Sequence, residues 1–162
     1  MPILKDTTLE SNKYLKINFD GGDLSSDAGL LLIKEFACKL GFVKLLKSEF
    51  KTNDTASFRY HKDDENLWQV IYQILGAYFE DDCADELTKD PILTAILVKK
   101  ALASQPTLSR FFNRMDEDSL NQFYTLMRRF RKVVYSIKKP EIILLDLDST
   151  LLNTYGHQEG CR

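Results

Sequence analysis

The sequence has few cysteines, glycines and prolines, and each scarcity excludes a class of protein. Cys38, Cys83 and Cys161 are odd in number and far apart, which excludes a disulfide framework and a cysteine-pair zinc site and fits a reducing cytoplasm. With 7 Gly and 4 Pro in 162 residues, the chain is neither collagen-like nor proline-rich. No apolar run approaches the ~20 residues of a membrane-spanning helix, and the N-terminus has no secretion-signal pattern. We therefore expect a cytoplasmic protein without a membrane segment.

The chain also lacks a dominant charge. Lys and Arg number 22 and Asp and Glu 24, so the formal net charge is −2. This balance argues against a surface that binds nucleic acid on every side, but it permits a local basic patch. Hydrophobic residues make up 44% of the sequence, enough for the core of one domain and too many for a disordered tail.

Hydrophobic periodicity predicts a mainly helical region of residues 1–139 that leads into one strand. A short strand is expected over 14–19, where apolar and polar residues alternate. Helices are expected between Ser25 and Gly41, over 43–50, from 63 to 78, over 92–102 and 108–115, and from 116 onward. We expect a polar loop over 51–62 and an acidic surface turn with a short helix over 80–90. After Pro140, the continuous apolar run Ile142–Leu145 is typical of a strand buried on both faces.

Two aspartates follow this apolar run. Asp146 and Asp148 are two residues apart, so on a strand they would point to the same side. Adjacent carboxylates repel each other unless a cation or a shared proton compensates. Oxygen ligands of this kind suit Mg²⁺ or Mn²⁺. The alternative is that both residues merely end a strand or cap the next turn.

The segment around these aspartates resembles the first motif of haloacid-dehalogenase-type phosphatases, an apolar strand followed by D-x-D-x-T-L. In that family the motif opens the catalytic domain, and a lysine and further acids come far downstream. Here the motif lies near residue 162, which disfavours a phosphatase of this type.

A second resemblance covers nearly the whole chain. The supporting motifs are Leu24–Leu32, Gly76–Asp81, Leu87–Pro91, Leu102–Phe111, and the Asp146–Thr150 strand end followed by Gly156–Gly160. In this order they resemble the N-terminal part of bacterial insertion-sequence transposases with a DDE active site, specifically the insertion-sequence thirteen-eighty family. The resemblance implies a role in DNA transposition.

The resemblance also implies an RNase-H-like α/β catalytic domain, with its first strand in residues 140–162. Two divalent ions, Mg²⁺ or Mn²⁺, would be held by Asp, Asp and Glu and would promote phosphoryl transfer. By the motif match, Asp148 is the expected first catalytic acid and metal ligand, and Asp146 a second-shell or alternate ligand. The other two acids would lie beyond residue 162, so we expect a truncated transposase that is inactive alone.

Two segments are candidates for DNA contacts. Residues 92–102 and 108–115, with a break between them, have the pattern of a helix–turn–helix. Arg110, Asn113 and Arg114 would share one exposed face of its second helix. An ordinary helical hairpin with solvated arginines is the alternative reading of this pattern.

The second candidate is a basic run at the end of the last predicted helix. It contains Arg128, Arg129, Arg131 and Lys132, followed by Lys138 and Lys139, with no acid among them. Such a run can neutralise phosphates with salt-sensitive, sequence-independent affinity. A solvated helix end is the alternative. The expected partners are the terminal inverted repeats of the element and a second copy of the chain in a synaptic complex. A non-enzymatic DNA-binding module left by decay of the element is the other function that we consider.

Overall fold

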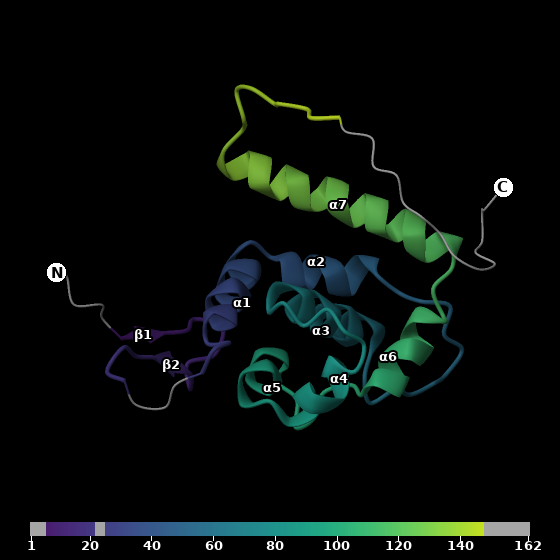
Figure 1. The fold of residues 1–162 in the computed structure, drawn as a ribbon. Helices are drawn as coiled ribbons and strands as arrows, with labels where there is room; N and C mark the ends of the chain where they lie inside the picture. The colour runs from purple at the N-terminus through teal and green to yellow at the C-terminus, as the bar shows by residue number, and fades with distance from the viewer. Residues whose placement is uncertain (1–5, 22–24, 148–162) are drawn as a thin grey trace.

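We describe a computed structural model of the chain in which residues 6–21 and 25–147 are placed. This part is mostly helical, as the periodicity predicts (Figure 1). Its elements are β1 (Thr7–Thr8), β2 (Lys16–Ile17), α1 (Gly29–Lys39), α2 (Phe42–Glu49), α3 (Asp63–Leu75), α4 (Cys83–Glu86), the 3₁₀ turn η1 (Leu87–Lys89), α5 (Pro91–Leu97), α6 (Gln105–Phe112) and α7 (Glu117–Ile137). None of the described helices is both long enough and apolar enough to cross a membrane.

The strand predicted over 14–19 exists but is short. Only Lys16 and Ile17 pair with β1, antiparallel, with Thr7 opposite Ile17. The hairpin is fastened to α1 by Glu35, whose carboxylate accepts hydrogen bonds from the backbone N–H groups of Glu10 at 3.2 Å and Ser11 at 2.9 Å. The Ser11 bond is the main reason that the pKa of Glu35 lies below its ordinary value.

The helix pair α1–α2 turns at a glycine, as predicted. Gly41 has φ of +72°, a left-handed conformation that glycine adopts without a Cβ clash. The predicted second helix begins one residue early, at Phe42, and ends at Glu49. Leu46 and Phe50 are almost fully buried in the core. Figure 1 shows α2 between α3 and α7.

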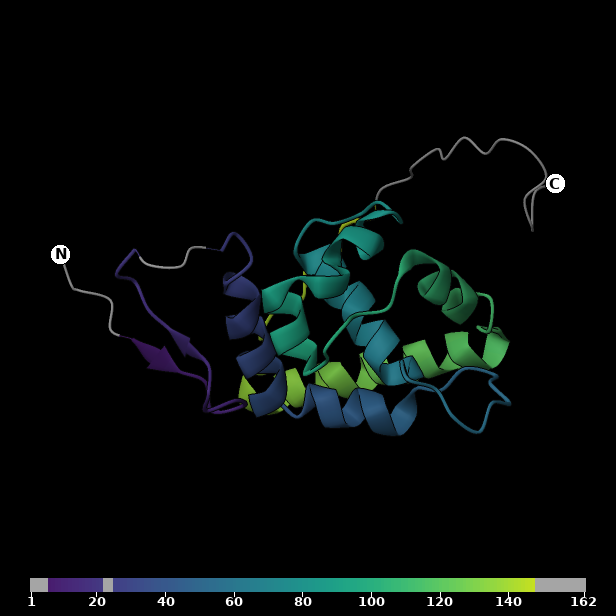
Figure 2. The same cartoon turned by 90° about the horizontal axis from the view of Figure 1, so that it is seen from below.

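Helix α3 is central to the helical body. It packs against α5 and α6 and carries the buried Trp68 and Tyr72. Figure 2 shows α5 and α6 along its length. Gln69 makes two buried hydrogen bonds with the backbone of Ala103: its amide donates to the carbonyl at 2.7 Å, and its oxygen accepts from the N–H at 2.8 Å. These bonds hold the segment before α6 against α3 and satisfy groups that water cannot reach.

A buried lysine side chain from α1 lies at the C-terminal end of α5. Lys34 of α1 is 7% exposed, and its ammonium donates to the carbonyls of Ala95 and Ile96. These carbonyls are among the last of α5 and lack helical partners. A cation at this end also interacts favourably with the negative end of the helix dipole. Burial lowers the pKa of Lys34 from its ordinary value.

The predicted bounds of two neighbouring helices are wrong. The helix predicted over 92–102 ends at Leu97, because Val98 takes a left-handed conformation with φ of 54°. The break predicted at 105–107 is instead the first turn of α6, and the helix ends at Phe112 rather than Met115. Proline is compatible with a first turn, where its missing N–H has no intrahelical partner, so Pro106 begins a helix here.

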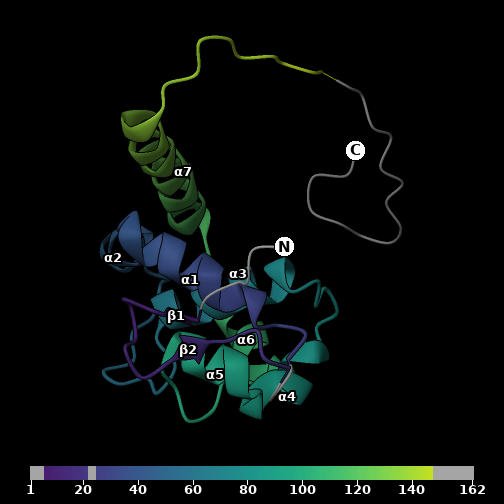
Figure 3. The same cartoon turned by 90° about the vertical axis from the view of Figure 1, so that its left-hand side faces the viewer.

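The buried strand predicted over 142–145 is also absent from the described residues. Residues 142–147 form no strand and are exposed, with Leu144 at 90% and Leu147 at 94%. A strand needs a neighbour to receive its backbone hydrogen bonds, and β1 and β2, the strands of the described part, pair only with each other. Figure 3 shows this segment running away from the helical body.

Candidate nucleic-acid interface

The three residues predicted to share one face of the second helix occupy different environments. Arg110 is exposed on α6, and no carboxylate among the described residues lies within ion-pair distance of it. Asn113 is also exposed but follows the last residue of α6. Arg114 is partly buried, with 17% of its side chain exposed. Of the three, only Arg110 and Asn113 are therefore exposed, and Arg110 also donates to Thr107 Oγ1 at 3.5 Å.

Arg114 holds α6 against the start of α3. Its guanidinium lies 3.0 Å from a carboxylate oxygen of Asp63 and 3.6 Å from one of Asp54. It also donates to Thr52 Oγ1 at 3.3 Å and to the Arg110 carbonyl at 3.0 Å. Because these donors are engaged within the protein, the contacts of Arg114 position the α6 end rather than leave a free cation.

A shallow hollow beside Arg110 gathers further cations that the sequence pattern did not indicate. It has a volume of about 180 Å³ and is lined in part by Arg59, His61, Thr107 and Arg110. Arg59 binds Asp54 through two hydrogen bonds, at 2.7 and 3.0 Å, and these chiefly hold the pKa of Asp54 below its ordinary value. Burial, and then the charge of Lys99, lower the pKa of His61.

Lys99 contacts Tyr60, which lines this hollow. We call Arg59, Lys99 and Arg110 together the basic corner. The ammonium of Lys99 pairs with Glu65 at 2.6 Å and donates to the Tyr60 carbonyl at 2.7 Å. Neither Arg59 nor Lys99 belongs to a recognisable motif, and each comes from a segment separate from α6. The loop before α3 brings Arg59 to the hollow that Arg110 lines, and Lys99 contacts that loop through the Tyr60 carbonyl. No local signal in the sequence could therefore have found them.

The basic run on α7 is exposed, as predicted from its sequence. Arg129 pairs with Glu49 of α2 at 2.7 Å and so helps to fix α7 on α2. Within the described residues no ion pair is formed by the remaining cations of the run, which are Arg128, Arg131, Lys132, Lys138 and Lys139. Free cations along one helix can bind phosphates without first breaking an ion pair.

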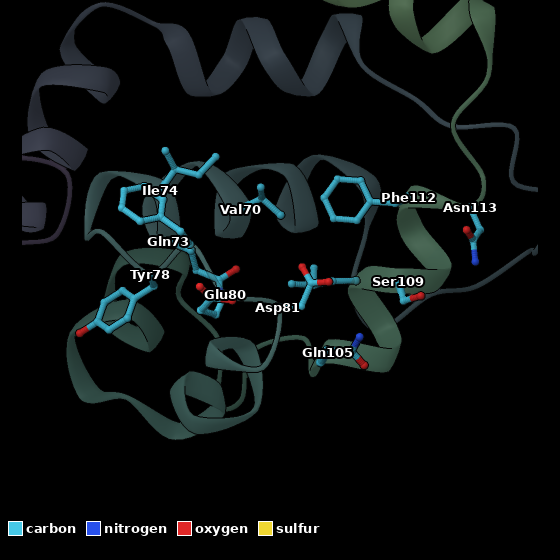
Figure 4. A pocket seen from close by; sticks show the side chains of 12 residues that line it. Val70, Gln73, Ile74, Tyr78, Glu80, Asp81, Gln105, Ser109, Phe112 and Asn113 are labelled. Atoms are coloured by element: carbon cyan, nitrogen blue, oxygen red, sulfur yellow. The ribbon is translucent and has the colours of Figure 1, made fainter. Parts of the chain in front are cut away.

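The largest concavity of this region differs from the basic corner in its chemistry. It holds about 570 Å³ between α3, α6 and the turn at 78–81 (Figure 4). Ile74 and Phe112 give it apolar walls, while Glu80 and Asp81 bring negative charge to its rim. Carboxylates repel phosphates, so this groove is unsuited to a nucleic-acid backbone.

The predicted acidic pair is described only in part. Asp146 lies in the exposed segment 141–147, and Asp148 lies outside the described residues. In the described part of the chain, no group of three or more His, Cys, Asp or Glu side chains is placed to hold a metal ion. These residues thus do not build a metal centre by themselves, and no catalytic step follows from them.

Comparison with known families identifies the family of this protein. A family model described as transposase DDE domain group 1 matches residues 7–162. The chain belongs to this family. No curated protein and no solved structure matches it.

Membership of the transposase DDE domain family indicates which kind of molecule the basic surfaces would contact. Transposases act on DNA, and DDE domains generally use divalent metal ions held by carboxylates. The exposed Arg110 and the free cations of α7 are among the described groups with the chemistry to contact DNA phosphates. The match does not distinguish Asp146 from Asp148, and their roles remain predictions.

Proposed function

We propose that this chain binds the terminal inverted repeats of a bacterial insertion sequence, as the DNA-recognition region of a DDE transposase of the insertion-sequence thirteen-eighty family. The observation that carries the proposal is the set of free cations at the basic end of α7. The exposed Arg110 on α6 adds a second contact region. Two copies of the chain act together on the two ends of the element.

The two regions have different roles in this proposal. Arg128, Arg131 and Lys132 on α7, with Arg129 contributing through its exposed half, contact phosphates and supply most of the affinity. Arg110 and Asn113 approach base edges and supply the preference for the repeat sequence. We assign Arg114 to positioning, because its ion pairs with Asp63 and Asp54 fix the end of α6 that carries Asn113.

For catalysis, we propose that Asp148 is the first metal ligand of an RNase-H-like domain beginning near residue 140, with Asp146 as a second-shell or alternate ligand. The metal ions, Mg²⁺ or Mn²⁺, would activate the attacking oxygen and stabilise the leaving one. In this proposal Asp146 and Asp148 do not by themselves complete the Asp, Asp and Glu set. A polypeptide of residues 1–162 should therefore bind repeat DNA with these ions present and neither nick nor join it.

The binding experiment measures the affinity of residues 1–162 for repeat DNA and for a scrambled duplex over a range of salt concentrations. The logarithm of the association constant should fall linearly with the logarithm of salt, and each phosphate-contacting residue of α7 changed to Ala should reduce the slope by ~0.9. Lys89→Ala is the matched control, since Lys89 is an exposed cation on η1, which packs against α4 and α5.

Arg110→Ala tests sequence recognition separately. It should weaken binding to the repeat more than to the scrambled duplex, because a base contact is worth ~1–3 kcal/mol only on the correct base. Equal losses on both duplexes would contradict base reading by α6. If wild-type residues 1–162 show no binding at low salt, DNA recognition by this region is wrong. Reproducible metal-dependent cleavage by this polypeptide would refute the proposal that Asp146 and Asp148 leave the acid set incomplete.

A further inference from the structure

Helix α7 carries an apolar stripe that the helical body does not cover. Leu120, Tyr124, Met127 and Val134 are 50%, 61%, 61% and 43% exposed. Their spacing of four, three and seven residues matches the alternating four and three of a coiled-coil seam, with Arg131 at the intermediate position. Figures 1 and 3 show α7 as the outermost helix, with no other described helix on the side away from α2.

The stripe is separate from the face that binds α2. Phe123, Leu126 and Phe130 form that second face, and the ring of Phe130 lies 4.3 Å from the ring of Phe42. Leu126 is buried, whereas Met127, the next residue, is mostly exposed. The helix thus has one apolar face satisfied within the chain and a second one left to solvent.

The charges of α7 are complementary to those of a second copy of the helix in antiparallel orientation. Its first turn is acidic, with Glu117 and Asp118, and its second half contains Arg128, Arg131 and Lys132. An antiparallel copy places each acidic end beside the basic end of the other helix. The helix dipoles are then also opposed, which favours this orientation over a parallel one.

We infer that the stripe pairs two copies of this chain through α7 in an antiparallel, two-fold symmetric contact. A two-fold contact requires a self-complementary surface, and the charges of α7 meet this requirement in the antiparallel orientation. In the matching register, Tyr124 of each copy lies opposite Met127 of the other, and Leu120 opposite Arg131. Arg131 then reaches Glu117 of the other copy within one helical turn.

This pairing rests on the proposal that two copies act together. Of the proposed DNA contacts it retains Arg128 and Lys132, whereas it engages Arg131 with the other copy. Arg128 and Lys132 lie on the side of the stripe opposite to the α2 face, by helical spacing. In an antiparallel pair the equivalent sides of the two helices lie on one face of the pair. The cations of both copies would therefore form one continuous basic surface, with the two helical bodies on the other face.

The first experiment measures self-association without DNA, by sedimentation velocity of residues 1–162 over a concentration series. Wild type should show a reversible monomer–dimer equilibrium. Met127→Glu should raise the dimer dissociation constant by about 100-fold or more, because it buries an unpaired charge at the centre of the contact. Ser136→Glu is the control: it adds the same charge to an exposed position of α7 away from the stripe and should leave the constant within about threefold.

A charge exchange tests the antiparallel register. Glu117→Arg alone and Arg131→Glu alone should each weaken self-association, since each copy then places like charges together. An equimolar mixture of the two variants should restore a dimer containing one copy of each, because both ends of the mixed pair again join opposite charges. Circular dichroism of each variant confirms that α7 remains helical.

The outcomes separate this inference from the proposed function. A wild-type chain that stays monomeric up to high micromolar concentration overturns the pairing, whatever its affinity for DNA. A dimer insensitive to Met127→Glu, or a charge mixture that gives no mixed dimer, overturns the α7 surface or its antiparallel register. Dimer formation with no affinity for repeat DNA leaves the pairing intact and refutes the DNA proposal alone.

Discussion

The helical body of α1–α6 and the C-terminal arm formed by α7 and residues 138–147 differ in how they use apolar residues. In the body, Leu93 and Phe111 are fully buried, and the buried Gln69 has partners for its amide. In the arm, Met127 and Leu144 are exposed by 61% and 90%. The body buries these apolar side chains and pairs this amide, whereas much of the arm leaves apolar side chains exposed.

This difference indicates where function can be changed without unfolding the chain. Substitutions in the body should act on stability first, because they leave cavities or unpaired buried groups. Substitutions in the arm should act on association with DNA or with a second copy. Four predictions test this contrast, and their expected effects on the free energy of unfolding decrease in order.

The largest effect is expected from truncating a core ring. Phe111→Ala should lower the free energy of unfolding by about 3–5 kcal/mol, because Phe111 is fully buried and lies against Phe50 with ring centroids 6.1 Å apart. Leu144→Ala, in the arm, should change it by less than about 0.5 kcal/mol. Urea unfolding of both variants measures the contrast, and equal losses would show that residues 141–147 are buried in solution.

Removing a buried amide should have the next largest effect. Gln69→Leu leaves the N–H and carbonyl of Ala103 without partners and should lower the free energy of unfolding by about 1–3 kcal/mol. Gln73→Leu is the control one turn later on α3, where the side-chain amide bonds to no other described residue. Urea unfolding again provides the measurement. A loss no larger than that of the control would mean that water replaces the Gln69 bonds.

Arg114 and Arg110 should separate stability from DNA binding. Arg114→Ala breaks the partly buried pair with Asp63 and should cost about 1–2 kcal/mol, between the values for exposed and fully buried pairs. Arg110→Ala should leave the unfolding free energy within about 0.5 kcal/mol. Thermal or urea unfolding measures both variants. The reverse order would show that Arg110, not Arg114, fixes the end of α6.

The smallest effect concerns acid stability. Hydrogen bonds from Arg59, and next from the backbone of Ala56, lower the pKa of Asp54 in the folded state. Its contribution is therefore complete above the ordinary carboxyl pKa and is lost as the pH falls through the lower, folded value. Asp54→Asn should make the fall of stability with acidification less steep, as measured by urea midpoints from pH 6 to pH 2. Asp82→Asn, at an exposed carboxylate without an ion pair among the described residues, should keep the wild-type slope.

Local signals in the sequence predicted much of the helical body. Gly41 ends α1 as expected, the acidic start of α3 begins a helix at Asp63, and Asp116 caps α7 through the N–H of Ser119. These features depend on residues a few positions apart, so short patterns reveal them. The α5 boundary was wrong because Val98 adopts a left-handed conformation that nothing in its residue type favours.

The candidate interface was predictable only where it lies on one helix. The basic run of α7 is contiguous, so its exposure follows from its composition and position. Arg110 and Arg114 looked equivalent in the sequence, but Asp63 and Asp54 from another segment engage only Arg114. The roles of Asp146 and Asp148 stay predictions, with Asp148 outside the described residues.

The sequence by itself determined the helical content, the basic and apolar periodicity of α7 and the likeness to DDE transposases, because each is written in residues that are neighbours along the chain. Only the tertiary structure decided which of two apolar faces α7 buries, which arginine stays free, and which cations join Arg110. Those outcomes depend on contacts between distant segments, where a partly buried carboxylate or an aromatic ring selects one partner among residues of the same type.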